Sequence, residues 1–247
     1  MNARSTGATH GDAVSIPYDK QTVDSSNPLA RYAHRSRINK SVQLALSKLN
    51  HGKVLDYGCG SGVFIQALNS LRSDCAVGYE PFMTDRTGQA LPIYSEIEDI
   101  ESMGPFSLVT LFETIEHLSD EETTRFLGTC QKVLSAAGGV LMSGPIEIGP
   151  ALLAKEFNRS IRQLALPDYG IAEFVKASLF GVAAGRANNI KTSHKGFDFR
   201  RAVDFIRKSG WAVDVLHFGP LPIGTWYGNS QFYLWLSRGQ LTAARRS

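Results

Sequence analysis

The chain has 247 residues, of which 43% are hydrophobic and 20% are charged, and its formal net charge is +3. This composition is that of an ordinary globular protein and excludes a wholly disordered or fibrous chain. A charge so close to neutral gives no reason to expect nucleic acid as a partner, and no apolar run reaches the roughly 18 residues that a membrane span needs.

The cysteines and the first residues bear on the compartment. Cys59, Cys75 and Cys130 have no C-x-x-C spacing and are too few for a disulfide framework. Residues 1–19 contain no apolar segment of the kind found in secretory signals. We therefore expect a cytoplasmic protein in a reducing compartment. The sequence carries no indication of the oligomeric state.

The first half of the chain predicts strands that alternate with helices. Residues 1–26 are rich in small and polar residues and are expected to form a flexible lead-in. A helical pattern follows over residues 29–49. The expected strands are 53–57, 75–80, 91–94, 106–112 and 140–143, and the expected helices are 61–71 and 119–134. Such alternation indicates βαβ units and a parallel sheet.

After residue 144 the alternation stops. Residues 145–193 form an insertion in which we expect helices over 151–166 and 171–184 but no strand. A helix over 199–209 and strands over 212–218 and 231–237 follow, and 239–247 form a polar tail. The favoured role of the insertion is a lid over the acceptor pocket. A helical pair packed on the sheet edge, and a face that docks on a partner or membrane, are the alternatives.

Three glycines stand where the strand over 53–57 meets the next helix. Gly58, Gly60 and Gly62 occupy alternate positions, and Asp56 precedes them on the strand. Glycine permits positive φ and close approach of a ligand, and the start of a helix offers unpaired N–H groups. A dinucleotide-binding G-x-G-x-x-G sequence would require glycine where Val63 stands, which disfavours NAD or FAD.

This segment resembles the first motif of class I S-adenosylmethionine-dependent methyltransferases. Two further blocks strengthen the resemblance: Glu80 and Pro81 end the strand over 75–80, and residues 106–118 contain the E-x-x-E-H sequence of the small-molecule branch, of methyltransferase type 11 or 12. The resemblance covers residues 30–145 and 197–237. It implies an α/β fold with a Rossmann-like, mostly parallel, seven-stranded sheet flanked by helices. It also implies a cofactor-binding part over 27–144 and a C-terminal part over 194–238.

The resemblance also implies the cofactor-binding residues. Asp56 and the glycine turn would hold the methionine part of S-adenosylmethionine, and Glu80 would accept hydrogen bonds from both ribose hydroxyls. The complete expected set is Asp56, Gly58, Cys59, Gly60, Gly62, Glu80, Pro81, Phe112 and Glu113. Basic residues of the first helix, Arg31, Arg35 and Arg37, are candidates to pair with the cofactor carboxylate, and Tyr32 and His34 are candidates to close over it.

The candidate catalytic residues are His117 and His194. His117 follows the strand over 106–112, at the sheet edge where α/β proteins bind ligands, and its imidazole suits a general base for a hydroxyl. His194 faces the site or caps a loop. A less favoured alternative, implied by the resemblance, is a divalent metal held by Glu113, Glu116, His117 and His194. A third interpretation is that Glu113, Glu116 and His117 only form hydrogen bonds that shape the loop.

The expected function is methyl transfer from S-adenosylmethionine to a small-molecule acceptor or a glycan or lipid precursor, with a hydroxyl as the acceptor group. Two alternatives stay open. One is a cofactor-binding regulatory or scaffold protein without catalysis, which the presence of His117 disfavours. The other is an NAD-dependent oxidoreductase, which Val63 disfavours.

Overall fold

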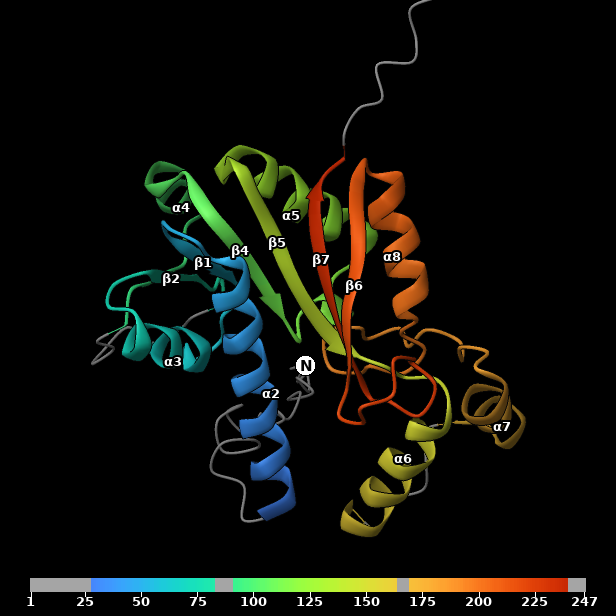
Figure 1. The fold of residues 1–247 in the computed structure, drawn as a ribbon. Helices are drawn as coiled ribbons and strands as arrows, with labels where there is room; N and C mark the ends of the chain where they lie inside the picture. Colours follow the sequence, from blue (N-terminus) through green and yellow to red (C-terminus); the bar gives the residue numbers. More distant parts are fainter. Residues whose placement is uncertain (1–27, 83–90, 164–168, 240–247) are drawn as a thin grey trace, which may run out of the picture.

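The computed structural model of the chain describes residues 28–82, 91–163 and 169–239. Within them, one sheet of seven strands has the order β3-β2-β1-β4-β5-β7-β6 (Figure 1). The strands are β1 (Val54–Tyr57), β2 (Ala76–Tyr79), β3 (Ile93–Tyr94), β4 (Phe106–Phe112), β5 (Leu134–Pro145), β6 (Trp211–Gly219) and β7 (Gln231–Arg238). Only β7 runs antiparallel to its neighbours in this sheet. The predicted Rossmann-like fold is therefore confirmed.

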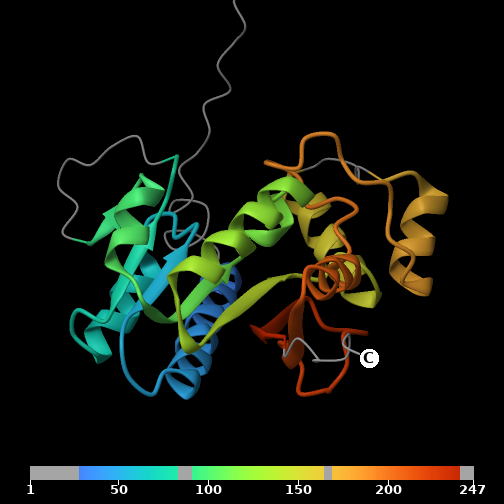
Figure 2. The same ribbon diagram turned by 90° about the horizontal axis from the view of Figure 1, so that it is seen from above.

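Helices cover both faces of the sheet (Figure 2). Apolar residues of α2 (Pro28–Lys48) and α3 (Val63–Leu71) pack in one core cluster. Apolar residues of α4 (Ile97–Met103), α5 (Asp120–Val133) and α8 (Phe199–Lys208) pack in the other. β4 contributes Leu108 to the first cluster and Val109 to the second, so its residues are buried on both faces. This explains why its sequence is almost continuously apolar.

Helix α5 lies where a helix over 119–134 was expected, whereas the strand that follows it begins earlier than expected. Ser119 and Glu122 form the reciprocal hydrogen bonds of a capping box. The helix ends at Val133, and β5 begins at Leu134 rather than at the expected residue 140. Gly139 instead lies inside β5, where a Cβ atom would collide with the ring of Trp235 on β7. Glycine at this position therefore permits the packing of Trp235 across the two strands.

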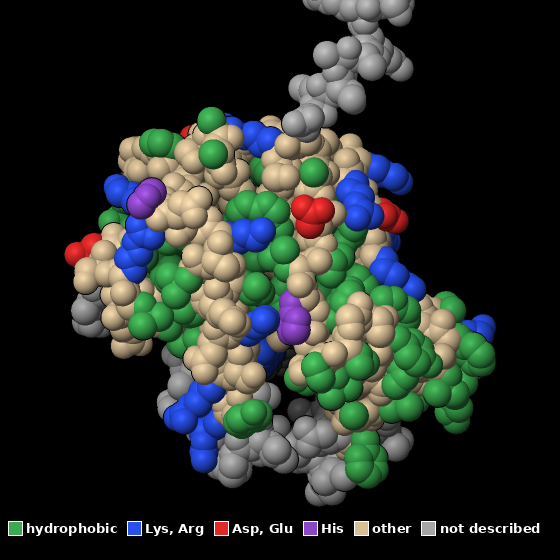
Figure 3. Space-filling model, in the orientation of Figure 1, with side chains coloured by type: hydrophobic (Ala, Val, Ile, Leu, Met, Phe, Trp, Pro, Cys, Tyr) green, Lys and Arg blue, Asp and Glu red, His purple; other side chains and the backbone are tan. Residues whose placement is uncertain are grey.

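The insertion contains two helices, as predicted, but the second ends at Phe180 rather than at the expected residue 184, and residues 181–193 form no helix or strand. The helices are α6 (Pro150–Gln163) and α7 (Ile171–Phe180), while residues 164–168 lie outside the described part. Both helices project beyond the carboxyl ends of β4 and β5 (Figure 1), and hydrophobic side chains gather on the surface in their neighbourhood (Figure 3). Among the described residues, no helix is both long and apolar enough to span a membrane. Helix α4 was not expected from the sequence.

Candidate active site

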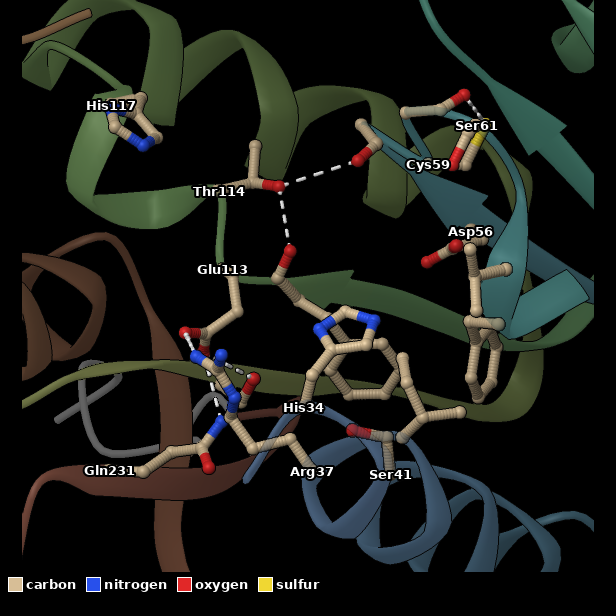
Figure 4. Close-up of a pocket in the computed structure, with 17 residues that line it drawn as sticks. His34, Arg37, Ser41, Asp56, Cys59, Ser61, Glu113, Thr114, His117 and Gln231 are labelled. Carbon is tan, nitrogen blue, oxygen red and sulfur yellow. Dashed lines mark hydrogen bonds and ion pairs between the residues drawn. The ribbon is translucent and has the colours of Figure 1, made fainter. Parts of the chain in front are cut away.

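A cavity of about 330 Å³ lies at the carboxyl ends of β1 and β4, next to α2 (Figure 4). Several predicted site residues line it: Asp56, Gly58, Cys59, Gly60, Phe112, Glu113 and His117. Helix α2 adds His34, Arg37, Ile38 and Ser41, and the strands β5 and β7 add Ser143 and Gln231. Gly62, Glu80, Pro81 and His194 lie outside this lining. The cavity is of the size of small-ligand sites and lies where open α/β sheets bind ligands.

The glycine turn between β1 and α3 needs glycine for its backbone. Gly58, Gly60 and Gly62 have φ values of 72°, 51° and 79°, a region that other residues rarely adopt. At Gly60 a Cβ atom would have no neighbour within 4 Å, so this part of the turn is open to a ligand. At Gly62 it would meet Ile93 and Leu91 at 2.8 Å, so that glycine also permits close packing.

Glu80 lies directly beside this turn. Its Oε2 accepts a hydrogen bond of 3.0 Å from the Gly60 N–H, and its Oε1 accepts one of 3.2 Å from the Phe82 N–H. These contacts fix the carboxylate at the end of β2, and each oxygen retains a lone pair for a further donor. Pro81, which follows, is exposed. Glu80 is therefore held in a position from which it can bind a ligand that extends from the turn.

Asp56 is a buried carboxyl at the end of β1. It accepts a hydrogen bond of 2.7 Å from Thr110 Oγ1 on β4. Burial, and to a smaller extent the charge of Glu80, raises the pKa of Asp56 to about 7 although the hydrogen bond from Thr110 lowers it. A positively charged ligand group beside Asp56 would stabilise its ionised form. Burial likewise raises the pKa of the neighbouring Cys59, so this cysteine is a neutral thiol.

Glu113 is held by three elements around the cavity (Figure 4). Its Oε1 accepts hydrogen bonds from Ser143 on β5 at 3.1 Å and from Gln231 on β7 at 3.0 Å, and its Oε2 pairs with Arg37 of α2 at 3.0 Å. Its φ of 49° is unusual for a residue other than glycine, and such strain persists where the surroundings fix the conformation. Ser143 and Gln231 were missed by the sequence analysis.

His117 and His194 meet at the edge of the cavity. The Nε2 atoms of the two rings are 3.1 Å apart, and His117 Nδ1 lies 2.8 Å from the carbonyl oxygen of Ile190. Since a carbonyl only accepts, Nδ1 of His117 carries its hydrogen and Nε2 holds a lone pair when the ring is neutral. Burial lowers the pKa of His117 and so favours this neutral form. The single lone pair of His117 Nε2 faces the N–H of His194 Nε2, so His117 can accept a proton from a ligand only when the ligand replaces this contact.

Behind the two histidines lies a buried carboxyl group. Glu116 is 1% exposed, and neither of its side-chain oxygens has a hydrogen-bond partner among the described residues. Burial raises the pKa of Glu116 well above its ordinary value. Its Oε1 lies 3.8 Å from His194 Nε2, while His194 Nδ1 lies 3.4 Å from Glu147. Glu147 in turn pairs with Lys155 of α6. Neither Glu147 nor Lys155 was predicted from the sequence as a site residue.

The expected metal set is changed by this geometry. Glu113 is excluded because Arg37, Ser143 and Gln231 hold its carboxylate. One ligand atom each from Glu116, His117 and His194 lie within 4.8 Å of one another. Two imidazoles and one carboxylate form a donor set that suits several transition metals. Glu147 beside His194 Nδ1, and the Ile190 carbonyl beside His117 Nδ1, resemble the outer contacts that orient metal-bound histidines. The three residues thus fit a divalent cation.

Comparisons with known proteins bear on the family and the fold of the chain. A family model described as a methyltransferase domain matches residues 29–166. No curated protein matches the sequence significantly.

Several solved structures share the fold. The PH0226 protein from Pyrococcus horikoshii OT3 has a TM-score of 0.57 and 14% identity, covering 90% of this chain and 96% of its own. The small RNA methyltransferase HEN1 has a TM-score of 0.54 and 14% identity, covering 83% of this chain and 25% of its own. The plantazolicin methyltransferase BpumL was solved with a desmethyl plantazolicin analogue and S-adenosylhomocysteine. It has a TM-score of 0.50 and 11% identity, and the match covers 90% of this chain and 88% of BpumL. These similarities show a shared fold.

Proposed function

Because this chain belongs to the methyltransferase-domain family, we propose that it transfers the methyl group of S-adenosylmethionine to a hydroxyl of a small molecule or of a glycan or lipid precursor. The observation that carries the proposal is the cavity that joins the glycine turn to His117. One end offers an open glycine turn and carboxylates for the cofactor, and the other offers a neutral imidazole for an acceptor hydroxyl.

The cofactor is proposed to lie along the glycine turn. Glu80 accepts hydrogen bonds from the ribose hydroxyls, and Asp56 stabilises the ammonium group of the methionine part, whose charge favours the ionised carboxyl. Arg37 and His34 of α2 contribute to the opposite wall of the cavity. Other expected contacts, from Gly62, Pro81 and Phe112, stay predictions.

When bound, S-adenosylmethionine supplies a methyl carbon activated by a positively charged sulfur. The leaving group needs no further activation, so the protein's main contribution is to position the acceptor for in-line attack. His117 Nε2 then accepts the proton that the acceptor hydroxyl loses. This transfer requires the acceptor hydroxyl to replace the 3.1 Å contact between the two Nε2 atoms of His194 and His117, while the carbonyl of Ile190 fixes the tautomer of His117.

A second candidate is metal-assisted transfer at the same place. The buried oxygens of Glu116, which have no hydrogen-bond partner among the described residues, favour it. Glu116, His117 and His194 would hold the cation. A divalent cation there would lower the pKa of a bound hydroxyl and so replace the base. Calorimetry with Mn²⁺ and Zn²⁺ tests this candidate. Binding that is lost in Glu116→Gln supports it, whereas absence of binding together with turnover that survives chelation refutes it.

Direct binding distinguishes the proposed function from its alternatives. We expect S-adenosylhomocysteine to bind and NADH not to bind in isothermal titration calorimetry. Tight binding of NADH would instead support an oxidoreductase. A protein that binds S-adenosylhomocysteine but methylates no hydroxylated small molecule, glycan precursor or lipid precursor would be the cofactor-binding, non-catalytic alternative.

A further inference from the structure

The insertion presents large apolar side chains to solvent. On α6, Phe157 is 70% exposed, and on α7, Ile171 and Phe180 are 87% and 73% exposed. Val175, Leu179 and Val182 are also exposed. We call these six residues the apolar face. In Figure 3 hydrophobic side chains form a broad patch in this part of the molecule. A gathered patch of this kind on a soluble domain indicates an interaction surface.

The pattern of α7 shows that this exposure is not scattered. Ile171, Val175 and Leu179 recur every fourth residue, so they lie on one side of the helix, and all three are exposed. The side that faces the protein carries Ala177 and Ser178, both buried. An ordinary surface helix turns its large apolar residues inward, so α7 has the opposite arrangement.

Basic residues accompany the apolar face. On α6 the acidic residue Glu156 is buried, and the exposed Lys155 pairs with Glu147. On α7 the one acidic residue, Glu173, pairs with Lys195 at 3.0 Å, while Lys176 adds a positive charge. Residues 28–48 of α2 contain five Lys or Arg residues and no acidic residue. The N-terminal end of α2 projects on the same side of the molecule as α6 (Figure 1).

We propose that the apolar face docks on an anionic membrane surface. Helices that bury aromatic and aliphatic side chains at a membrane interface, beside basic residues, bind through both apolar burial and attraction to anionic lipids. The cavity lies at the same carboxyl edge of the sheet from which α6 and α7 project. Docking would therefore turn the cavity toward the bilayer. This inference goes beyond the proposed function, since docking requires neither cofactor nor turnover.

Sedimentation with vesicles tests the proposal on the full chain. We expect binding to vesicles of phosphatidylcholine with phosphatidylglycerol, and weaker binding to phosphatidylcholine alone or at high salt. The double variant Phe157→Ser/Phe180→Ser should bind at least about tenfold more weakly, since two buried aromatic side chains are lost. Leu71→Ser, which removes a side chain that is 67% exposed at the end of α3, is the matched control and should bind like the unmodified protein.

Two outcomes would overturn the proposal. One is absence of vesicle binding, or binding unchanged in the double variant. The other is a dimer in light scattering that the double variant converts to a monomer, which would make the face a contact between two copies. Retained S-adenosylhomocysteine affinity in the double variant would show that its fold is intact. A failure of cofactor binding in the unmodified protein, with vesicle binding kept, would reject only the proposed function.

Discussion

Nε2 of His117 lies 3.1 Å from Nε2 of His194, although the two residues are 77 positions apart. The contact joins the loop after β4 to the segment after the insertion. It gives His117 a neighbour that restrains its ring, while the Ile190 carbonyl on the other side sets which nitrogen is basic. The Ile190 contact orients the His117 ring for proton transfer, and an acceptor hydroxyl that displaces His194 would reach the basic nitrogen.

Replacement of His117 should affect turnover and not cofactor binding. With an acceptor found by screening, we expect His117→Ala to lower the rate of S-adenosylhomocysteine formation by about 100-fold or more, because general-base catalysis is lost. The affinity for S-adenosylhomocysteine, measured by calorimetry, should stay the same. His51→Ala, which changes an exposed histidine, is the control. Unchanged turnover in His117→Ala would refute the role of base.

Glu80 should determine a large part of the cofactor affinity. We expect Glu80→Ala to weaken S-adenosylhomocysteine binding by about tenfold or more, since hydrogen bonds to a charged carboxylate contribute about 1.5–3 kcal/mol each. The variant also loses the contacts to the Gly60 and Phe82 N–H groups, so Glu80→Gln is compared with it. Glu96→Ala, an exposed glutamate, is the control. An affinity equal to that of the unmodified protein would contradict the ribose assignment.

Asp56 should make cofactor binding depend on pH. With a pKa of about 7, about half of the Asp56 carboxyls are protonated at pH 7. An ammonium group favours the ionised form, so binding should release about half a proton at pH 7, and affinity should rise by about tenfold between pH 6 and pH 8. Calorimetry in buffers of different ionisation enthalpy measures the release. Asp56→Asn should lack this contribution, and an identical release in both proteins would contradict the assignment.

The same carboxyl should affect stability without ligand. Burial raises the pKa of Asp56 above its ordinary value of 3.8, so the folded state holds this proton more strongly than the unfolded state. Its contribution to stability is therefore present at low pH, declines as the pH rises from about 4 to about 7, and is lost above that. Urea unfolding across this range should show a shallower decline in Asp56→Asn. Equal slopes would indicate that Asp56 does not titrate in this window.

The pair of Arg37 and Glu113 should stabilise the cavity wall. Arg37→Met leaves the carboxylate with Ser143 and Gln231 only, and we expect it to lower the free energy of unfolding by about 1 kcal/mol. Arg125→Met breaks an exposed i,i+4 pair with Glu121 and should cost about 0.5 kcal/mol or less. Urea unfolding measures both. Equal effects of the two variants would show that the Arg37 pair contributes no more than a surface pair.

Much of the sheet could be predicted because its signals are local. The apolar run of β4 and the three glycines after β1 lie in short stretches of sequence, and the structure places both as expected. The helix α4 was missed because only Ile100 in it is buried, which leaves almost no periodic pattern. The start of β5 was missed because Gly139 is required by Trp235, a residue of a strand almost one hundred positions later.

The site could be predicted only in part for the same reason. Asp56 lies on β1, and Glu80 and His117 follow strands, each within an identifiable motif. Ser143 and Gln231, by contrast, reach Glu113 from positions 30 and 118 residues away, and neither belongs to a motif. The one available signal was that Ser143 and Gln231 lie at the ends of predicted strands. The order of the strands determines which polar residues at strand ends can reach the same carboxylate. Only the structure gives that order.

Isothermal titration calorimetry of S-adenosylhomocysteine against the unmodified protein, with NADH as the comparison ligand, tests the central claim most directly. The proposed function predicts a single site for S-adenosylhomocysteine that is weakened by Glu80→Ala, and no heat of binding for NADH. Absence of S-adenosylhomocysteine binding, or tight binding of NADH at the same site, would contradict the assignment of the cavity beside Gly60 and His117 to a methyl-transfer cofactor.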